Sequence, residues 1–111
     1  MQNFNKKKFL SVSVEQMINE RGNGAMNQFV IRDYNNNIMM FQSYDSLIAV
    51  VDFINSKIYL GSDWDYSVTT GKHRNIFFRD YIRISQLSTK KGLEKALKEG
   101  KYGIWEINLL S

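Results

Sequence analysis

From residue 64 to residue 74 the chain reads Trp64-Asp65-Tyr66-Ser67-Val68-Thr69-Thr70-Gly71-Lys72-His73-Arg74. Aromatic and hydroxyl side chains precede the glycine of this stretch, and cations follow it. The residues before the stretch alternate as strands do, whereas apolar residues after it recur at helical spacing. The stretch therefore marks the boundary between a strand-rich half and a helical half, and the predicted fold is built outward from it.

The half before this boundary predicts a meander of about four antiparallel strands. Turn residues fall at 35–37, 43–46 and 55–56, and asparagine is favoured at such places because it visits the left-handed region cheaply. The strands predicted around these turns cover residues 28–34, 38–42, 47–54 and 57–60. The third of them is the most apolar, so we place it at the centre of the sheet.

The segment before the meander predicts a short helix over residues 14–20. Ser13 can cap its first turn, because a serine hydroxyl accepts from the open N–H groups there. Val14, Met17 and Ile18 form an i, i+3, i+4 apolar stripe, and Gly22-Asn23-Gly24 would then end the helix.

The half after the boundary predicts two helices and a closing strand. Phe77, Tyr81 and Ile84 recur at helical spacing, which indicates a helix from residue 69 or 70 to residue 83. A further helix over residues 89–99 ends at Gly100, and residues 102–110 alternate as a strand does.

We therefore expect one α+β domain over residues 1–111, with an antiparallel meander sheet of four or five strands packed by two or three helices. Residues 1–10, which include Lys6-Lys7-Lys8, are expected to be either a flexible basic arm or a short edge strand.

Composition excludes several classes of protein. The chain has no cysteine, which removes disulfides and thiolate metal sites. Its apolar runs are far shorter than the roughly 20 residues that a membrane-spanning helix needs, so we expect no membrane association and a cytoplasmic location in a bacterial host. The net charge of +4 favours an acidic protein surface or a phosphate backbone as partner, although an ordinary solvated basic surface also accounts for it.

The sequence predicts no enzyme, no cofactor and no metal site. His73 is the single histidine, and its neighbours Thr69 and Thr70 are explained by helix capping as well as by catalysis. Asp63 and Asp65 resemble the beginning of a calcium loop, but the later ligand positions do not follow.

A basic stripe on the first predicted helix is the best candidate for a binding face. On an ideal helix Lys72, Asn75, Arg79 and Arg83 share one face, opposite the apolar residues. The following helix repeats the pattern with Lys91, Lys95 and Lys98. Such stripes can lie along phosphates or in an acidic protein groove, and they are also common as solvated helix faces.

Trp64 and Tyr66 are a candidate aromatic hot spot for a protein partner if they are exposed. Aromatic residues at a strand-to-helix junction also serve as core plugs, and this interpretation is the one that we favour.

Two motifs resemble those of a known family. The segments Phe41-Gln42-Ser43-Tyr44 with Leu47-Ile48-Ala49, and Trp64 through Arg74, are similar to those of small uncharacterised proteins carried by bacteriophages and other mobile elements of Gram-positive bacteria. The resemblance covers about residues 28–80 and transfers no activity. It implies a context in which small proteins often bind and block a host machine.

The leading hypothesis is a phage-encoded, non-enzymatic protein that inhibits a host nucleic-acid-targeting defence complex, such as a CRISPR effector, by stoichiometric protein binding. The alternative is a sequence-independent DNA- or RNA-binding accessory protein of phage replication. A homodimer or larger homo-oligomer, recognisable by an exposed apolar patch, is a third possibility.

Overall fold

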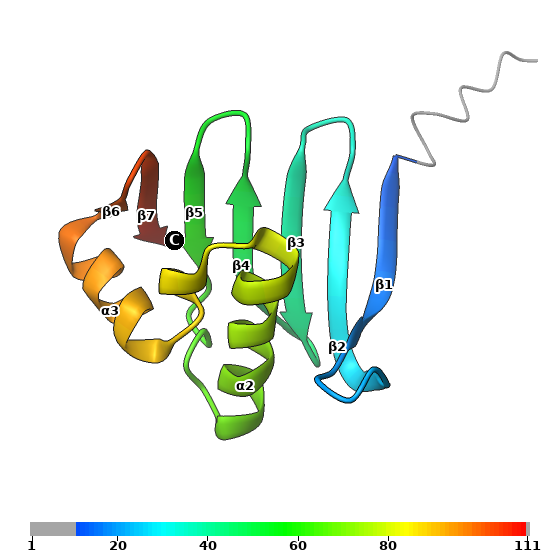
Figure 1. The fold of residues 1–111 in the computed structure, drawn as a ribbon. Helices are drawn as coiled ribbons and strands as arrows, with labels where there is room; N and C mark the ends of the chain where they lie inside the picture. The colour runs from blue at the N-terminus through cyan, green and yellow to red at the C-terminus, as the bar shows by residue number, and fades with distance from the viewer. Residues whose placement is uncertain (1–10, 111) are drawn as a thin grey trace, which may run out of the picture.

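The computed structural model describes residues 11–110, which form one seven-stranded sheet with helices on one of its faces (Figure 1). The expected arm at residues 1–10 lies outside the described residues. In space the strands follow the order β1-β2-β3-β4-β5-β7-β6. Their bounds are Val12–Ile18, Gly24–Asp33, Ile38–Ser43, Ser46–Asp52, Lys57–Leu60, Lys101–Tyr102 and Trp105–Leu109 for β1 to β7.

The prediction of four or five antiparallel strands is wrong in number and in direction. Strands β1 to β5 form an antiparallel meander, but β7 pairs with β5 in parallel. A parallel neighbour requires a long crossover connection, and here the crossover contains both helices. The predicted closing strand over residues 102–110 is observed as the short β6–β7 hairpin. The most apolar strand, β4, is the fourth of the seven, as expected.

The predicted helix over residues 14–20 is also wrong, because this segment is the edge strand β1. Its alternation places Met17 in the core, while Val14 points away from the helices and is 64% exposed. This segment forms backbone hydrogen bonds with β2 in place of helical ones. An apolar stripe within the segment contains no information about pairing with another strand. Gly22, with a φ of +81°, forms part of the hairpin turn between the two strands and does not end a helix.

The turns of the meander were predicted correctly, and two of them are stabilised by the same pattern of hydrogen bonds to an aspartate. Asp33 and Asp52 each accept hydrogen bonds from the backbone N–H groups two and three residues later, and from the Asn36 and Asn55 side chains respectively. These side-chain amide donors, aided by the backbone donors, lower the pKa of both aspartates. In these two turns Asn37 and Ser56 adopt the left-handed backbone conformation.

The helical half runs from α2 (Val68–Ile76) without a break into a π-helical segment, η1 (Phe77–Ile82). The 3₁₀ turn η2 (Ser85–Leu87) leads to α3 (Lys90–Glu99). Thr89 caps the first turn of α3, and Gly100, with a φ of +76°, ends the helix as predicted. In the part of the chain that the structure describes, no helix has the length and apolar composition needed to span a membrane.

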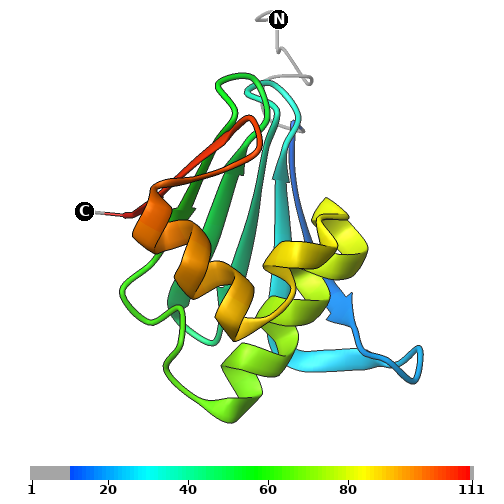
Figure 2. The same cartoon turned by 60° about the vertical axis from the view of Figure 1, so that its left-hand side comes forward.

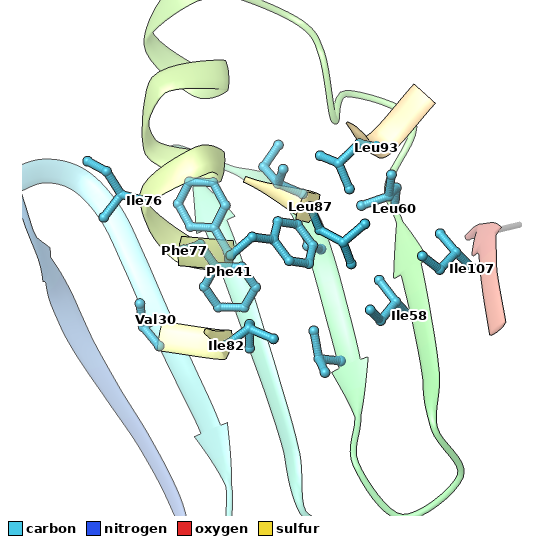
Figure 3. Packing of buried hydrophobic residues seen from close by; sticks show 14 of the residues in the cluster. Val30, Phe41, Ile58, Leu60, Ile76, Phe77, Ile82, Leu87, Leu93 and Ile107 are labelled. Carbon is cyan, nitrogen blue, oxygen red and sulfur yellow. The ribbon is translucent and has the colours of Figure 1, made fainter. Parts of the chain in front are cut away.

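Both helices cover the same face of the sheet, as the turned view makes plain (Figure 2). Phe41 of β3 stacks on Phe77 of η1 with 5.7 Å between the ring centroids, and Phe78 packs edge-on against Phe77. Around these rings lie fully buried aliphatic residues from the sheet and from the helical half (Figure 3). They include Val30, Ile58, Leu60, Ile76, Leu87, Leu93 and Ile107. One continuous core therefore lies between the sheet and the helices.

Candidate functional site

The stretch from Trp64 to Arg74 lies in the loop from β5 to α2 and in the first turns of α2. Gly61 begins the loop, and its N–H donates to the Ile48 carbonyl at 2.8 Å. A Cβ at position 61 would lie 1.9 Å from the Leu47 carbonyl oxygen, so only glycine allows this approach of loop to sheet. Two consecutive turns follow, closed by hydrogen bonds from the Trp64 N–H to Gly61 and from the Tyr66 N–H to Asp63.

Ser67 ends the loop and caps α2. Its hydroxyl oxygen accepts from the Thr70 N–H at 3.1 Å, so Ser67 is the N-cap of the helix. Thr70 is buried, and its hydroxyl lies 3.2 Å from that of Ser43 on β3. Ser46 of β4 donates to the Asp63 carboxylate at 2.8 Å. These polar contacts fix the beginning of the helix against the sheet.

Arg74 is the largest side chain buried in the core, at 2% exposure. Its Nη1 donates to the Trp64 carbonyl at 2.9 Å and to Asp65 Oδ1 at 3.3 Å, and its Nη2 donates to Asn75 Oδ1 at 3.0 Å. The guanidinium also lies over the Trp64 ring, 5.2 Å from its centroid. Burial lowers the pKa of Arg74, which the Asp65 carboxylate opposes. The side chain ties the loop to α2.

Asp65 joins this arrangement to α3. Lys90, the first residue of α3, donates to Asp65 Oδ2 at 2.8 Å, while Arg74 occupies the other oxygen. The hydrogen bond from Lys90, followed by that from Arg74, lowers the pKa of Asp65, and Asp65 in turn raises the pKa of Lys90. One carboxylate thus connects the starts of the two helices.

A polar hollow of about 730 Å³ lies beside this ion-pair network. We call it the α2 hollow. Its rim carries two exposed apolar side chains, Tyr66 at 78% and Val68 at 90% exposure. Its walls come from the loop before α2, from α2 and η1, from the beginning of α3, and from Glu20 of the β1–β2 turn. The charged residues that line it are Glu20, Asp65, Lys72, Arg74, Arg79 and Lys90.

The predicted basic stripe is divided by the structure. Lys72, Asn75 and Arg79 line the α2 hollow together. Arg83 does not, because η1 winds more widely than an α-helix and ends at Arg83, which adopts the left-handed region with a φ of +68°. Asn75 accepts from Arg74, and Arg79 forms a two-point ion pair with Asp80 at 2.9 and 3.1 Å.

The cations of α3 lie elsewhere. Lys91, Lys95 and Lys98 are all exposed, and none of them lines the α2 hollow. Lys95 lines a second hollow of about 510 Å³, between η2, α3 and the β6–β7 hairpin. The seven predicted binding residues therefore form at least two separate surfaces.

The two aromatic residues of the candidate hot spot have different environments. Trp64 is partly buried, packs against the core and lies under the Arg74 guanidinium. Tyr66, two residues later, is among the most exposed large side chains of residues 11–110. Trp64 has the environment of a plug, and Tyr66 that of a contact residue.

The residues considered for catalysis are not brought together. The His73 Nδ1 lies 2.8 Å from the Thr69 carbonyl oxygen of its own helix. Asp63 interacts with Ser46, and Asp65 with Arg74 and Lys90, so neither of them orients the imidazole. Within residues 11–110 no three histidine or carboxylate side chains are grouped as metal ligands would be.

Sequence reasoning missed Arg74, the residue that organises the site. A buried arginine is rare unless it is paired, and a single sequence gives no signal for burial of a cation. The available hint was its position three residues after Gly71 and four after Thr70, which places it on the sheet-facing side of a helix capped by Ser67.

Fold and site together define a small α+β protein with a polar, charge-paired hollow beside its first helix. The chain belongs to a family of unknown function, DUF8033, whose model matches residues 12–97. This match confirms the expectation of an uncharacterised domain, whereas the phage origin stays a prediction. No curated protein and no solved structure matches the chain.

Proposed function

We propose that this protein is a non-enzymatic binding protein that occupies a protein partner stoichiometrically through the rim of the α2 hollow. The observation that carries the proposal is the exposure of Tyr66 and Val68 beside Lys72. Val68 and Lys72 are four residues apart on α2, so they share one side of the helix. Exposed aromatic and aliphatic side chains beside a cation are typical of protein contact surfaces.

The charges around the hollow favour a protein partner over a nucleic acid. Arg79 is paired with Asp80, and both Arg74 and Lys90 are paired with Asp65. Among the cations of the described chain that line this hollow, Lys72 alone has no ion pair. A phosphate backbone is bound through several unpaired cations, and this surface offers too few of them.

The finer proposal is that the partner is a host nucleic-acid-targeting defence complex of the CRISPR type, and that the protein comes from a phage or another mobile element. Support for this part comes from the resemblance of the motifs at residues 41–49 and 64–74 to mobile-element proteins. The basic pI of about 9.4 favours an acidic patch on the partner and argues against mimicry of nucleic acid.

The test is an interference assay in a bacterial host with an active CRISPR effector. Expression of the protein should restore plaques of a targeted phage, and purified effector should retain the tagged protein after nuclease treatment. Tyr66→Ala combined with Lys72→Glu should abolish both effects. Lys91→Glu, an exposed control outside the α2 hollow, should leave both intact. Equal activity of the two variants would contradict the choice of surface.

The runner-up is a sequence-independent nucleic-acid-binding protein, which the three exposed lysines of α3 favour. Fluorescence anisotropy with labelled single-stranded DNA and RNA tests it directly. Affinity that falls steeply with salt and is lost in the Lys91, Lys95 and Lys98 glutamate variant would support this function in place of the inhibitor.

A further inference from the structure

The sheet has a second face that no element of residues 11–110 covers. Both helices and η2 lie on the opposite face (Figures 1 and 2). Successive side chains of a strand point to opposite faces, and directly paired residues share a face. The register therefore separates the residues of the covered face, such as Val30, Phe41 and Ala49, from those of the bare face.

A row of apolar side chains crosses the middle of the bare face. Consecutive register pairs connect one residue of each strand from β1 to β5. These residues are Val14, Ile31, Met40, Val50 and Tyr59, and we call them the bare-face row. None of them belongs to the core cluster or packs against it. These five residues form a contiguous apolar patch across five strands, whereas the apolar residues of an ordinary protein surface are scattered singly.

Charge is confined to one side of this row. Next to it, at the end of the sheet where β1 begins, the register aligns five charged residues on the same face, namely Asp33, Asp52, Lys57, Glu106 and Lys101. On the other side of the row lie Gln16, Phe29 and Gln42, which carry no charge. The bare face thus has a charged border, in which three carboxylates outnumber two lysines, an apolar centre and a neutral border.

We propose that the bare face binds the bare face of a second copy of this chain, so that two sheets pack face to face in a homodimer. A two-fold axis that runs across the strands along the bare-face row places each apolar row on its copy. The same axis places the charged border of one copy over the neutral border of the other. An axis parallel to the strands would instead oppose the two charged borders, in which carboxylates outnumber lysines, and like-charge repulsion disfavours this arrangement.

The area of the bare face is large enough for a homodimer interface. The six longer strands, β1 to β5 and β7, lie about 4.8 Å apart and are about six residues long. At about 3.4 Å per residue they span roughly 600 Å² as a flat area. The relief of the side chains raises the accessible area above this value. Stable dimers bury about 800 Å² per partner, so nearly complete overlap of the two faces reaches the required size. Packing of two sheets about 10 Å apart is a common way to bury such faces.

The test is the mass of the full-length protein as a function of concentration, measured by sedimentation equilibrium. The mass should rise from 13.0 kDa toward twice that value. Val50→Lys, at the centre of the bare-face row, should raise the dissociation constant at least about tenfold, a loss of about 1.4 kcal/mol of binding free energy. Val68→Lys is the matched control, since it makes the same change at an exposed position on α2 and should leave the dissociation constant unchanged.

A second measurement decides the question if Val50→Lys does not fold. The chain has no cysteine, so Met40→Cys and Val68→Cys each introduce a single thiol. A bis-maleimide of about 10 Å span should cross-link Met40→Cys to a dimer faster than it cross-links the more exposed Val68→Cys. Faster linkage at position 68 would overturn the proposal. A mass of 13.0 kDa at every concentration would overturn it as well.

Discussion

The two faces of the sheet carry similar apolar side chains but differ in what lies on them. Phe41 and Met40 are neighbours on β3, yet Phe41 is fully buried under η1 and Met40 is not part of the core. The difference comes from the crossover between β5 and β7. Figure 1 shows that this connection is right-handed, as such connections nearly always are, and its hand places both helices on one face. Apolar alternation alone therefore does not tell which face becomes the core.

The strongest test of this difference is a matched pair of truncations on one strand. Phe41→Ala should lower the free energy of unfolding by about 3–5 kcal/mol, because it removes a ring that stacks on Phe77. Met40→Ala should lower it by less than about 1 kcal/mol when measured in urea at low protein concentration, where association does not contribute. Similar losses for the two variants would mean that the faces are equally buried.

A smaller effect is expected at Arg74, which holds the loop and α2 on the covered face. Arg74→Lys keeps the charge but loses the planar fork that reaches Trp64, Asp65 and Asn75, so unfolding in urea should need about 1–3 kcal/mol less. Arg79→Lys makes the same change at an exposed ion pair and should alter stability by less than about 0.5 kcal/mol. Trp64 fluorescence should shift to the red in the first variant alone. Equal stability of the two variants would show that the buried fork does not hold the loop.

The smallest effect is expected at Gln28, where the covered face contains a polar group that it does not satisfy. Within residues 11–110 neither side-chain amide atom of Gln28 has a hydrogen-bond partner, although the residue is 1% exposed. Gln28→Met keeps the approximate shape and should raise the free energy of unfolding by about 1 kcal/mol in urea. Ser43→Ala, at the cross-strand neighbour, should lower it, because Thr70 then loses its hydroxyl partner. A destabilised Gln28→Met variant would show that the amide is satisfied in solution.

The sequence by itself determined the local features of this protein. The turns after β2, β3 and β4, the central place of β4 and the helix end at Gly100 were all predicted from short-range rules. Such features depend on backbone preferences and on hydrogen bonds between residues a few positions apart, so a few neighbouring residues are enough to specify them.

Of the candidate binding residues, the sequence grouped Lys72, Asn75 and Arg79, and all three line the α2 hollow, although Arg79 lies in the π-helical segment η1. It did not separate Arg83 from them, since the spacing of apolar residues does not show that the helix changes to π-helical winding at Phe77. Nor did it distinguish the plug Trp64 from the exposed Tyr66.

Only the tertiary structure decided the rest. Residues 12–18 fit a helical stripe and a strand equally well, and pairing with β2 makes them a strand. The parallel pairing of β7 with β5 joins segments more than forty residues apart. Burial of Arg74 becomes possible because Trp64, Asp65 and Asn75 together satisfy its donors. In each case the deciding free energy comes from contacts between distant segments, which form only when the whole chain has folded.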